Sequence, residues 1–294
     1  MHSPTLRQRR VALAVLLAAF AAACGGRRDR FEYTLQGQIL SIEENRLQAN
    51  IRHEEIPGFM PAMTMPYKVR DAAEFEELAP GDLLTATLVV ESNDAYLMDV
   101  QRVGEAPLEQ PAQPAPSARS GLEMLQPGEQ VPDVTFVDQE GRERTFASFA
   151  GSTLVVTFIY TRCPMPTFCP LMDRHFVEIQ KQLEADAALG NVHLVTISFD
   201  PVTDTPPVLK AHAETLGANP ARWTFLTGDR DEVDRFAMRF GVSLMREGID
   251  ARDITHNLRT AIVDPQGRLV KAYTGNEWTP DEVVADLRQG RAAH

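Results

Sequence analysis

Two uninterrupted apolar runs in the second half of the chain constrain its fold more than any other feature. Residues 153–160 (TLVVTFIY) and 192–199 (VHLVTISF) are apolar enough to be strands that are buried on both faces. Between these runs, Leu171, Ile179 and Leu183 recur at helical spacing. A helix that follows one buried strand and leads to the next predicts a parallel arrangement of the two strands. The second half of the chain therefore has the pattern of an α/β domain.

The pattern that follows these strands narrows the α/β class. We predict further helices over residues 204–216, 231–240 and 279–287, and a β-hairpin formed by residues 260–263 and 268–273. Thr279 is the expected N-cap of the last helix, with Pro280 at its first position. The order strand, helix, strand, helix, hairpin, helix predicts a thioredoxin-like domain over residues 122–294.

The first third of the chain has a different pattern. Short β-rich runs alternate with turn residues there, and the predicted strands are residues 35–42, 46–52, 83–90 and 95–103. Short strands at this spacing predict a small, OB-like all-β barrel over residues 31–104. Residues 105–121 contain four prolines and almost no apolar bulk, so we expect a semi-extended linker between the two domains.

The N-terminus has the features of an export signal. Three arginines between residues 7 and 10 precede thirteen uncharged residues, 11–23, a run shorter than the ~20 apolar residues of a membrane span. The run ends in Ala-Ala-Ala-Cys24, which resembles a bacterial lipoprotein signal in which the cysteine is lipidated. The alternative is an ordinary signal peptide that is cleaved after the same run. We expect an exported protein, attached to a cell membrane through Cys24 and facing the periplasm or the outside.

Charge and motifs exclude several functional classes. The chain has 29 Lys and Arg against 41 Asp and Glu, a net charge of −12, and removal of residues 1–23 takes away three Arg and no acid, which leaves −15. Nucleic-acid binding needs clustered cations, so we expect no nucleic-acid partner. The sequence contains no phosphate loop, no serine-histidine-acid signature and no HExxH motif, which disfavours the common enzyme classes.

A pair of cysteines lies where chemistry is expected. Cys163 directly follows the first buried strand and Cys169 precedes the helix, where the helix N-terminus and Arg162 favour thiolates. Two such thiols either cycle through a disulfide or hold a soft metal, and a purely structural disulfide is the third alternative. His256 precedes the predicted hairpin, which in a thioredoxin-like fold lies near the cysteine loop. Two thiolates and one imidazole suit copper, unless His256 makes only a local hydrogen bond.

The residues around this pair resemble the SCO/SenC family of thioredoxin-like copper proteins. The resemblance covers roughly residues 122–290 and is carried by TFIYTRCP at the first cysteine, by FDP and DTP at residues 199–206, and by AIVD after His256. It implies copper delivery to the dinuclear copper site of cytochrome c oxidase, or redox preparation of that site. The oxidase copper-site subunit and other copper carriers are the implied partners. Five residues separate the cysteines here, whereas the family commonly has three.

A second group of soft donors lies in the predicted barrel. Three of the ten methionines, Met60, Met63 and Met65, fall within six residues. On a strand, Met63 and Met65 share one face, and a Pro-Gly turn at residues 57–58 allows His53 to fold back toward them. Thioethers with an imidazole suit Cu(I) or Ag(I), whereas methionines that merely fill core gaps are the alternative.

This stretch resembles the small periplasmic copper-binding barrel of the CusF type, over about residues 33–104. In that family a His and the two Met of a Met-Thr-Met-like pair hold the metal, and a Trp caps it. His53, Met63 and Met65 match these positions. Met60 stands near the place of the missing Trp, and it is the fourth candidate ligand.

Both halves of the sequence therefore point to copper. We predict an exported, membrane-tethered copper chaperone with two sites. The candidate ligands are Cys163, Cys169 and His256 in one site, and His53, Met63, Met65 and Met60 in the other. Passage of copper from the barrel to the cysteines is a further hypothesis. The alternatives are a thiol-disulfide oxidoreductase, in which Cys163 attacks and Cys169 resolves, and a copper-resistance buffer without an acceptor.

Overall fold

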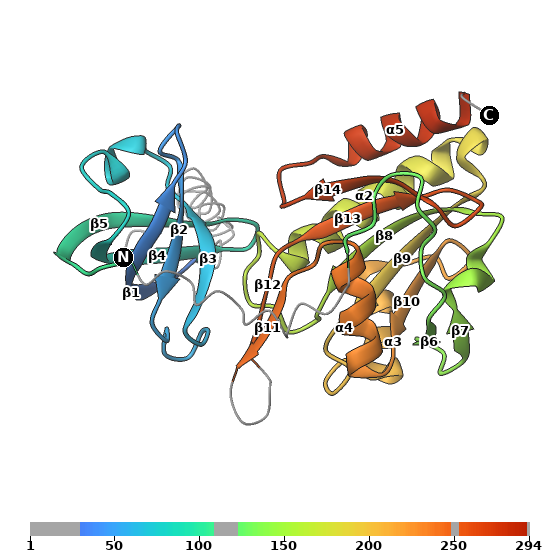
Figure 1. Cartoon of the computed structure of the whole chain (residues 1–294), viewed down its shortest axis with the longest axis horizontal. Helices are drawn as coiled ribbons and strands as arrows, with labels where there is room; N and C mark the ends of the chain where they lie inside the picture. The colour runs from blue at the N-terminus through green and yellow to red at the C-terminus, as the bar shows by residue number, and fades with distance from the viewer. Residues whose placement is uncertain (1–29, 109–122, 248–252, 293–294) are drawn as a thin grey trace, which may run out of the picture.

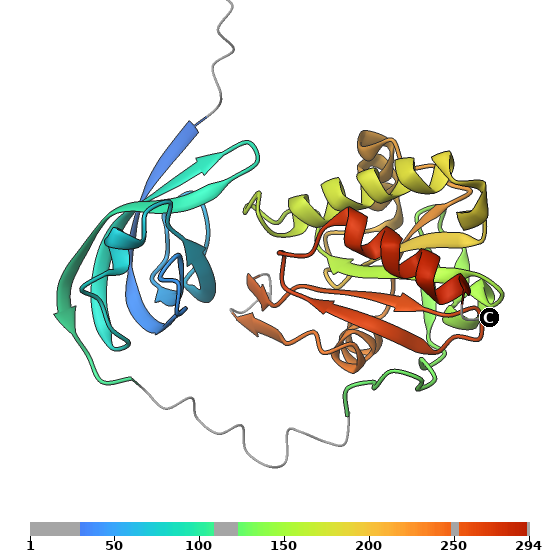
Figure 2. The same ribbon diagram turned by 90° about the horizontal axis from the view of Figure 1, so that it is seen from above.

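The computed structural model describes residues 30–108, 123–247 and 253–292, and these residues form two domains. Figures 1 and 2 show the β-domain beside the α/β domain, with β3 close to β12. The predicted lipid-bearing Cys24 and most of the predicted linker lie outside the described residues. Within the described ranges, no helix has the length and apolar character that crossing a membrane requires.

The first domain is a five-stranded antiparallel sheet that closes on itself. Its strands are β1 (Arg30–Ile42), β2 (Gln48–His53), β3 (Met63–Lys68), β4 (Asp82–Glu91) and β5 (Ala95–Glu105). Hydrogen-bonded neighbours follow the order β3-β2-β1-β4-β5. A parallel bridge between Val69 and Leu97 brings the end of β3 against β5 and closes the barrel. The sequence indicated four of these strands by their runs of β-forming residues, and the fifth, β3, carries the methionine pair.

A glycine allows β1 and β2 to approach closely where the candidate histidine lies. Gly37 pairs with His53 across the two strands. A Cβ atom at Gly37 would lie 2.7 Å from the carbonyl oxygen of Arg52 and 2.9 Å from the Cα atom of His53. Since no side chain fits in that space, Gly37 sets the backbone position of His53.

The second domain is built on a seven-stranded mixed sheet. Its elements are β6 (Thr135–Asp138), β7 (Glu143–Thr145), β8 (Thr153–Ile159), α2 (Cys169–Ala185), β9 (Val192–Ser198), α3 (Pro206–Leu216), β10 (Trp223–Thr227), α4 (Arg230–Arg239), β11 (Leu244–Glu247), β12 (Asp253–His256), β13 (Arg259–Val263), β14 (Leu269–Thr274) and α5 (Pro280–Ala292). The strand order is β14-β13-β8-β9-β10-β6-β7, and β11 pairs with β12 as a separate ribbon. Strands β8, β9 and β10 are parallel, and almost every residue of β8 and β9 is buried. The predicted pair of central strands, with α2 as their crossover, is confirmed.

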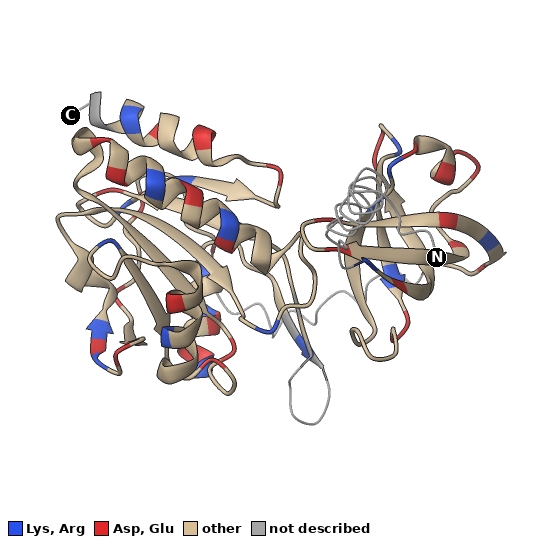
Figure 3. Cartoon of the chain, turned by 180° about the vertical axis from the view of Figure 1, so that it is seen from behind, with Lys and Arg blue, Asp and Glu red and all other residues tan. Residues whose placement is uncertain are grey.

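The ends of the helices follow local chemistry. Helix α5 begins with a capping box, because the backbone N–H of Thr279 donates to Glu282 and the N–H of Glu282 donates to the Thr279 hydroxyl. Helix α3 begins at Pro206, two residues later than predicted, because the carboxylate of Asp204 accepts hydrogen bonds from Thr161 and Ser198 instead. Along α2 and α5, acidic and basic residues are interspersed on the outer side (Figure 3), so these helices keep a solvated face.

Candidate metal centre

The two cysteines come together at the edge of the sheet despite the five residues between them. Strand β8 ends at Ile159 and α2 begins at Cys169. The intervening loop turns where the N–H of Phe168 donates to the carbonyl of Met165 at 3.0 Å. This turn places the reduced thiols of Cys163 and Cys169 within hydrogen-bonding reach of each other. The longer spacing therefore does not separate the thiols.

Neighbouring elements hold the thiol loop, residues 160–168, in place. Arg174 on α2 donates to the carbonyl of Pro166 at 2.8 Å, and the Asn276 amide donates to the carbonyl of Thr167 at 2.8 Å. Asp204 holds the start of the loop, because its carboxylate accepts from the Thr161 N–H at 3.0 Å and from the Thr161 hydroxyl at 2.5 Å. These contacts restrict the positions that the two sulfurs can take.

His256 faces the buried thiol. Its Nε2 atom lies 3.6 Å from the Sγ atom of Cys169, and its Nδ1 atom lies 2.9 Å from the carbonyl oxygen of Asn257. The ring is flanked by the aromatic rings of Phe199, at 4.6 Å between centroids, and Tyr160, at 5.6 Å. A carbonyl that accepts from Nδ1–H leaves the Nε2 lone pair directed at the thiols, which is the arrangement of a metal-ligating histidine.

The three groups have different proton affinities. A hydrogen bond from Cys169, with backbone bonds from Cys169 and Met165, lowers the pKa of the Cys163 thiol against the opposing effect of burial. Burial raises the pKa of Cys169 well above its ordinary value. Burial also lowers the pKa of His256 to about 4, so this imidazole is neutral at pH 7. Cys163 is thus the thiol that ionises first.

Two parts of the sequence prediction need correction. Cys169 stands at the first position of α2, yet burial outweighs the effect of the helix N-terminus on its pKa. Arg162 bonds through Nε to the carboxylate of Asp200 at 2.7 Å, and hydrogen bonds rather than the Arg162 charge are the main causes that lower the Cys163 pKa. The thiolate is therefore favoured by direct hydrogen bonds to sulfur.

The barrel carries the second group of donors on adjacent strands. His53 on β2 pairs with Met63 on β3, and Ile51 pairs with Met65, so His53, Met63 and Met65 share one face. Met60 lies beside them, and its sulfur accepts a hydrogen bond from the Tyr67 hydroxyl at 3.7 Å. The predicted common face of the methionine pair is observed.

His53 has an unused nitrogen in this group. The side chain is only 2% exposed, and its Nδ1 atom lies 2.6 Å from the carbonyl oxygen of Glu54. Its Nε2 atom has no hydrogen-bond partner among the residues that the structure describes. Buried polar atoms are normally paired, so an unpartnered imidazole nitrogen beside thioethers fits a site for a soft metal ion.

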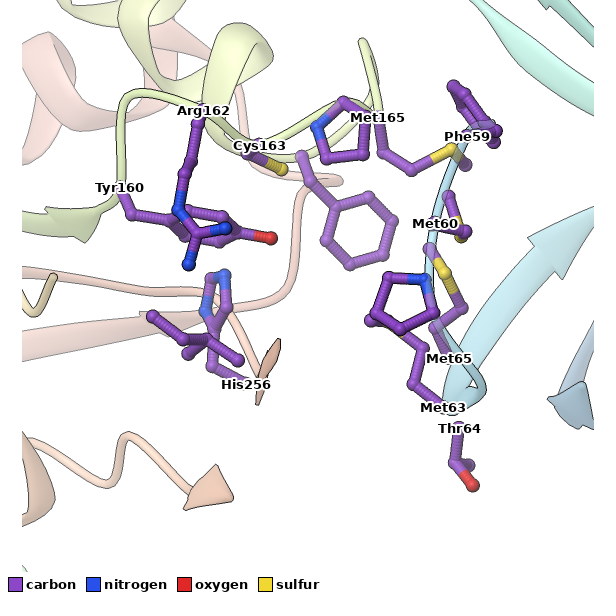
Figure 4. Close-up of a pocket in the computed structure, with 14 residues that line it drawn as sticks. Phe59, Met60, Met63, Thr64, Met65, Tyr160, Arg162, Cys163, Met165 and His256 are labelled. Atoms are coloured by element: carbon purple, nitrogen blue, oxygen red, sulfur yellow. The ribbon is translucent and has the colours of Figure 1, made fainter. Parts of the chain in front are cut away.

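Donors from both groups line one cavity, although His53 and Cys169 are not among its lining residues. A cavity of about 140 Å³ has walls from both domains, and its donor side chains are Met60, Met63, Met65, Cys163, Met165 and His256. Figure 4 shows the barrel residues on one side and the thiol loop with His256 on the other. In the described part of the chain, no three side chains of the types His, Cys, Asp and Glu already form a metal site. A bound ion would therefore bring Cys163, Cys169 and His256 closer together than they lie in this structure.

The SCO1/SenC family matches residues 123–291, more than half of the 294-residue chain. The chain belongs to the SCO1/SenC family. The family described as "Copper binding periplasmic protein CusF" matches residues 32–102. Both resemblances stated from the sequence are thus confirmed, and copper is the metal that both domains indicate. This SCO1/SenC chain places its CusF-like domain ahead of its thioredoxin-like domain.

Relatives of the SCO1/SenC chain align with about half of its length. It is 30% identical over 161 residues to the SCO1 protein homolog of Bacillus subtilis, which covers 54% of this chain and 81% of that protein. It is 26% identical over 164 residues to the mitochondrial SCO2 homolog of mouse, with 55% of this chain and 62% of that protein covered. The chain therefore spans less than two thirds of the mouse relative. A SCO1/SenC family lipoprotein from Bacillus anthracis shares the fold at a TM-score of 0.50 and 22% identity, over 57% of this chain and 98% of that one.

Three other histidines in the described part of the SCO1/SenC domain contact side chains that do not line this cavity. His175, the other histidine near the cysteines in sequence, is half-buried on α2 against Trp278, with ring centroids 4.6 Å apart. His212 pairs with Asp173 at 3.0 Å, and His193 lies 2.8 Å from the Thr224 hydroxyl. None of the three lines the cavity that His256 lines.

The FDP and DTP motifs have a role that the sequence did not reveal. Asp200 of the first motif holds Arg162, and Asp204 of the second holds Thr161, the two residues that precede Cys163. Both carboxylates are buried at the sheet edge. Their short spacing after a buried strand was the available signal, since an acidic residue is rarely buried without partners.

Proposed function

We propose that this chain is an exported copper chaperone that delivers copper to the dinuclear copper site of cytochrome c oxidase, or prepares the thiols of that site. The observation that carries the proposal is the position of His256 Nε2, 3.6 Å from Cys169, with Cys163 beside it. We assign Cys163, Cys169 and His256 as the ligands of the thiol site. Lipid attachment at Cys24 would keep this site near a membrane-bound acceptor, the oxidase copper-site subunit.

The thiol site suits an ion that must be both held and released. Copper is soft enough to bind two sulfurs and an imidazole. Because His256 is neutral at pH 7, it offers its lone pair without losing a proton. Cys163 is half-buried and ionises before the buried Cys169, so it is the sulfur that an incoming ion or an acceptor meets first. Ligand exchange at Cys163 then provides a route for release.

We assign a second, monovalent copper site to His53, Met63, Met65 and Met60 in the barrel. All four donors are neutral, and the group is largely buried. A divalent ion there would keep its full charge away from water, whereas Cu(I) carries half of that charge and prefers thioethers. This site would receive copper from other carriers in the periplasm and protect it from oxidation.

A thiol-disulfide oxidoreductase is the second candidate, and one observation favours it. The more acidic thiol, Cys163, is also the more exposed, and Cys169 lies buried behind it. That is the order of an attacking and a resolving thiol. In that case copper would be incidental to the cysteines, and His256 would be dispensable. A copper-resistance buffer is the third alternative, and it would hold metal without transferring it to an oxidase.

Metal stoichiometry tests the proposal. The two-domain chain from residue 25 onward, loaded with excess Cu(I) under reducing conditions and desalted, should retain two copper ions. Cys163→Ser should retain only the copper ion of the barrel site, and Met63→Leu should retain only the copper ion of the thiol site. Retention of both ions by Cys163→Ser would refute the thiol site. Addition of the apo oxidase copper subunit separates a chaperone from a buffer, because only a chaperone loses copper to it.

A further inference from the structure

Donors from both candidate copper sites line the same cavity, although the two sites belong to different domains. Strand β3, which carries Met63 and Met65, packs against β12, which ends at His256. A second cavity also has Met65 from the barrel and His256 from the thioredoxin-like domain among its lining residues. The domains therefore meet with their donor faces toward each other.

One sulfur in this cavity belongs to neither predicted site. Met165 lies in the thiol loop between Cys163 and Cys169, and it is 4% exposed. Figure 4 shows it on the side of the loop that faces Phe59 and Met60 of the barrel. Its backbone carbonyl accepts the hydrogen bond that forms the loop turn, so its position is fixed by the fold. The loop between the two cysteines thus places a thioether on the wall that faces the barrel.

We propose that this arrangement, in which the two domains of the chain are docked against each other around the cavity, is a transfer state. In it, Met165 is the thioether that takes Cu(I) from the barrel methionines and passes it to the cysteines. This inference depends on the two copper sites of the proposed function. The inference adds a route for copper between the two sites, and it names Met165 as the residue through which copper passes. The barrel donors Met60 and Met65 are only 5% and 7% exposed in this arrangement.

The transfer is an exchange of ligands without a change in oxidation state. Bonds from copper to the four barrel ligands, His53, Met60, Met63 and Met65, break one after another, and a bond to the Met165 sulfur forms in between. Bonds to Cys163, Cys169 and His256 replace it, and the two thiols lose their protons to solvent. Copper remains monovalent throughout, so no oxidant or reductant is needed. Since donors of both sites line one cavity with Met165 among them, the ion can pass between the domains while bound to the protein.

Methionine-methyl NMR with Ag(I), a redox-inert probe, tests the route. The two-domain chain carries Cys163→Ser and Cys169→Ser, so that only thioethers and imidazoles bind, and its methionine methyl groups are labelled with ¹³C. One equivalent of Ag(I) should shift the methyl signals of Met63, Met65 and Met165. Met172, buried in α2 outside both cavities, is the matched control and should stay in place.

The affinity of the same chain for Ag(I) gives the second readout. Met165→Leu keeps the volume but removes the sulfur, and it should weaken Ag(I) binding about tenfold, the scale on which a supporting ligand affects metal affinity. Met172→Leu should leave it unchanged. In the chain with both cysteines, Met165→Leu should slow the appearance of the copper-thiolate absorption after Cu(I) is loaded on the barrel.

The outcomes separate the two proposals. If Met63 and Met65 shift but Met165 does not, and Met165→Leu binds Ag(I) like the parent, the route is wrong while the barrel site stands. If no methionine shifts, the barrel site itself is wrong. A transfer rate that rises in proportion to protein concentration would also overturn the docked route, because it would show transfer between molecules.

Discussion

Replacing Asp204 by alanine should detach the thiol loop from the sheet edge and weaken copper binding without touching a ligand. The Asp204 side chain is fully buried. It accepts hydrogen bonds from the Thr161 N–H at 3.0 Å, the Thr161 hydroxyl at 2.5 Å and the Ser198 hydroxyl at 2.5 Å. Alanine removes all three and leaves the backbone N–H of Thr161 buried without this acceptor.

The expected loss follows from these three bonds. Hydrogen bonds to a charged acceptor contribute about 1.5–3 kcal/mol each, and relaxation recovers part of that, so we expect about 4 kcal/mol in the free energy of unfolding. For a domain of this size, that loss lowers the melting temperature by about 10 °C. Because Thr161 lies two residues before Cys163, the sulfur moves with it. Affinity for Cu(I) at the thiol site should fall about tenfold or more.

Asp138→Ala is the matched control. Asp138 is equally buried, accepts from the backbone N–H groups of Glu140 and Arg142, and pairs with the side chains of Arg142 and Arg144, far along the sheet from the thiol loop. Calorimetry should show a similar loss of stability in both variants. Competition with a Cu(I) chelator should show a loss of affinity only in Asp204→Ala. Equal copper affinity in the two variants would refute the role of Asp204 in positioning the loop.

Three further predictions concern other parts of the molecule. Gly37→Ala should destabilise the barrel by about 1–3 kcal/mol and weaken Ag(I) binding there, because the added Cβ meets backbone. In Gly104→Ala the added Cβ would lie 3.6 Å from a side-chain carbon, so neither stability nor Ag(I) affinity should change when both variants are titrated with Ag(I). His256→Ala should lower Cu(I) affinity about 10- to 100-fold and keep thiol-disulfide exchange with a model disulfide; loss of exchange instead would favour a catalytic histidine. Burial opposes the charge of Asp138, but its hydrogen bonds outweigh burial and lower its pKa, so its contribution to stability is present above pH ~4 and is lost as pH falls through the lowered pKa. Urea midpoints of the parent and Asp138→Ala should therefore converge in acid, and a constant difference down to pH 2 would contradict this.

The sequence predicted those features that depend on periodicity or on donor chemistry. The apolar runs of β8 and β9 admit only buried strands, and the alternation of Met63 and Met65 places both sulfurs on one face. The sequence analysis did not predict strand β10, which has five residues, or the ribbon of β11 and β12, which have four residues each. Such short strands are stabilised by neighbouring strands rather than by a sequence pattern of their own.

The meeting of the two domains lay beyond sequence reasoning for a physical reason. A proline-rich linker limits distance but does not fix orientation, so the shared cavity depends on complementary surfaces. Those surfaces consist of single residues from distant segments, such as Phe59, Met165 and Ile254. The sequence did not single out Met165, since no periodicity distinguishes a ligand from a packed side chain in the five residues between the cysteines.

The chemistry of the donors gives the proposed transfer a direction. The barrel offers neutral thioethers and an imidazole, whereas the thiol site offers sulfur anions, whose attraction for a cation is strengthened by burial. On the proposed route, we therefore expect copper to move from the barrel to the cysteines as long as Cys163 and Cys169 are reduced. When they form a disulfide, the anionic donors are lost and the barrel becomes the stronger site. If donors of both sites share one cavity as proposed, the redox state of the two thiols should decide where the ion resides, which a single site in either domain could not do.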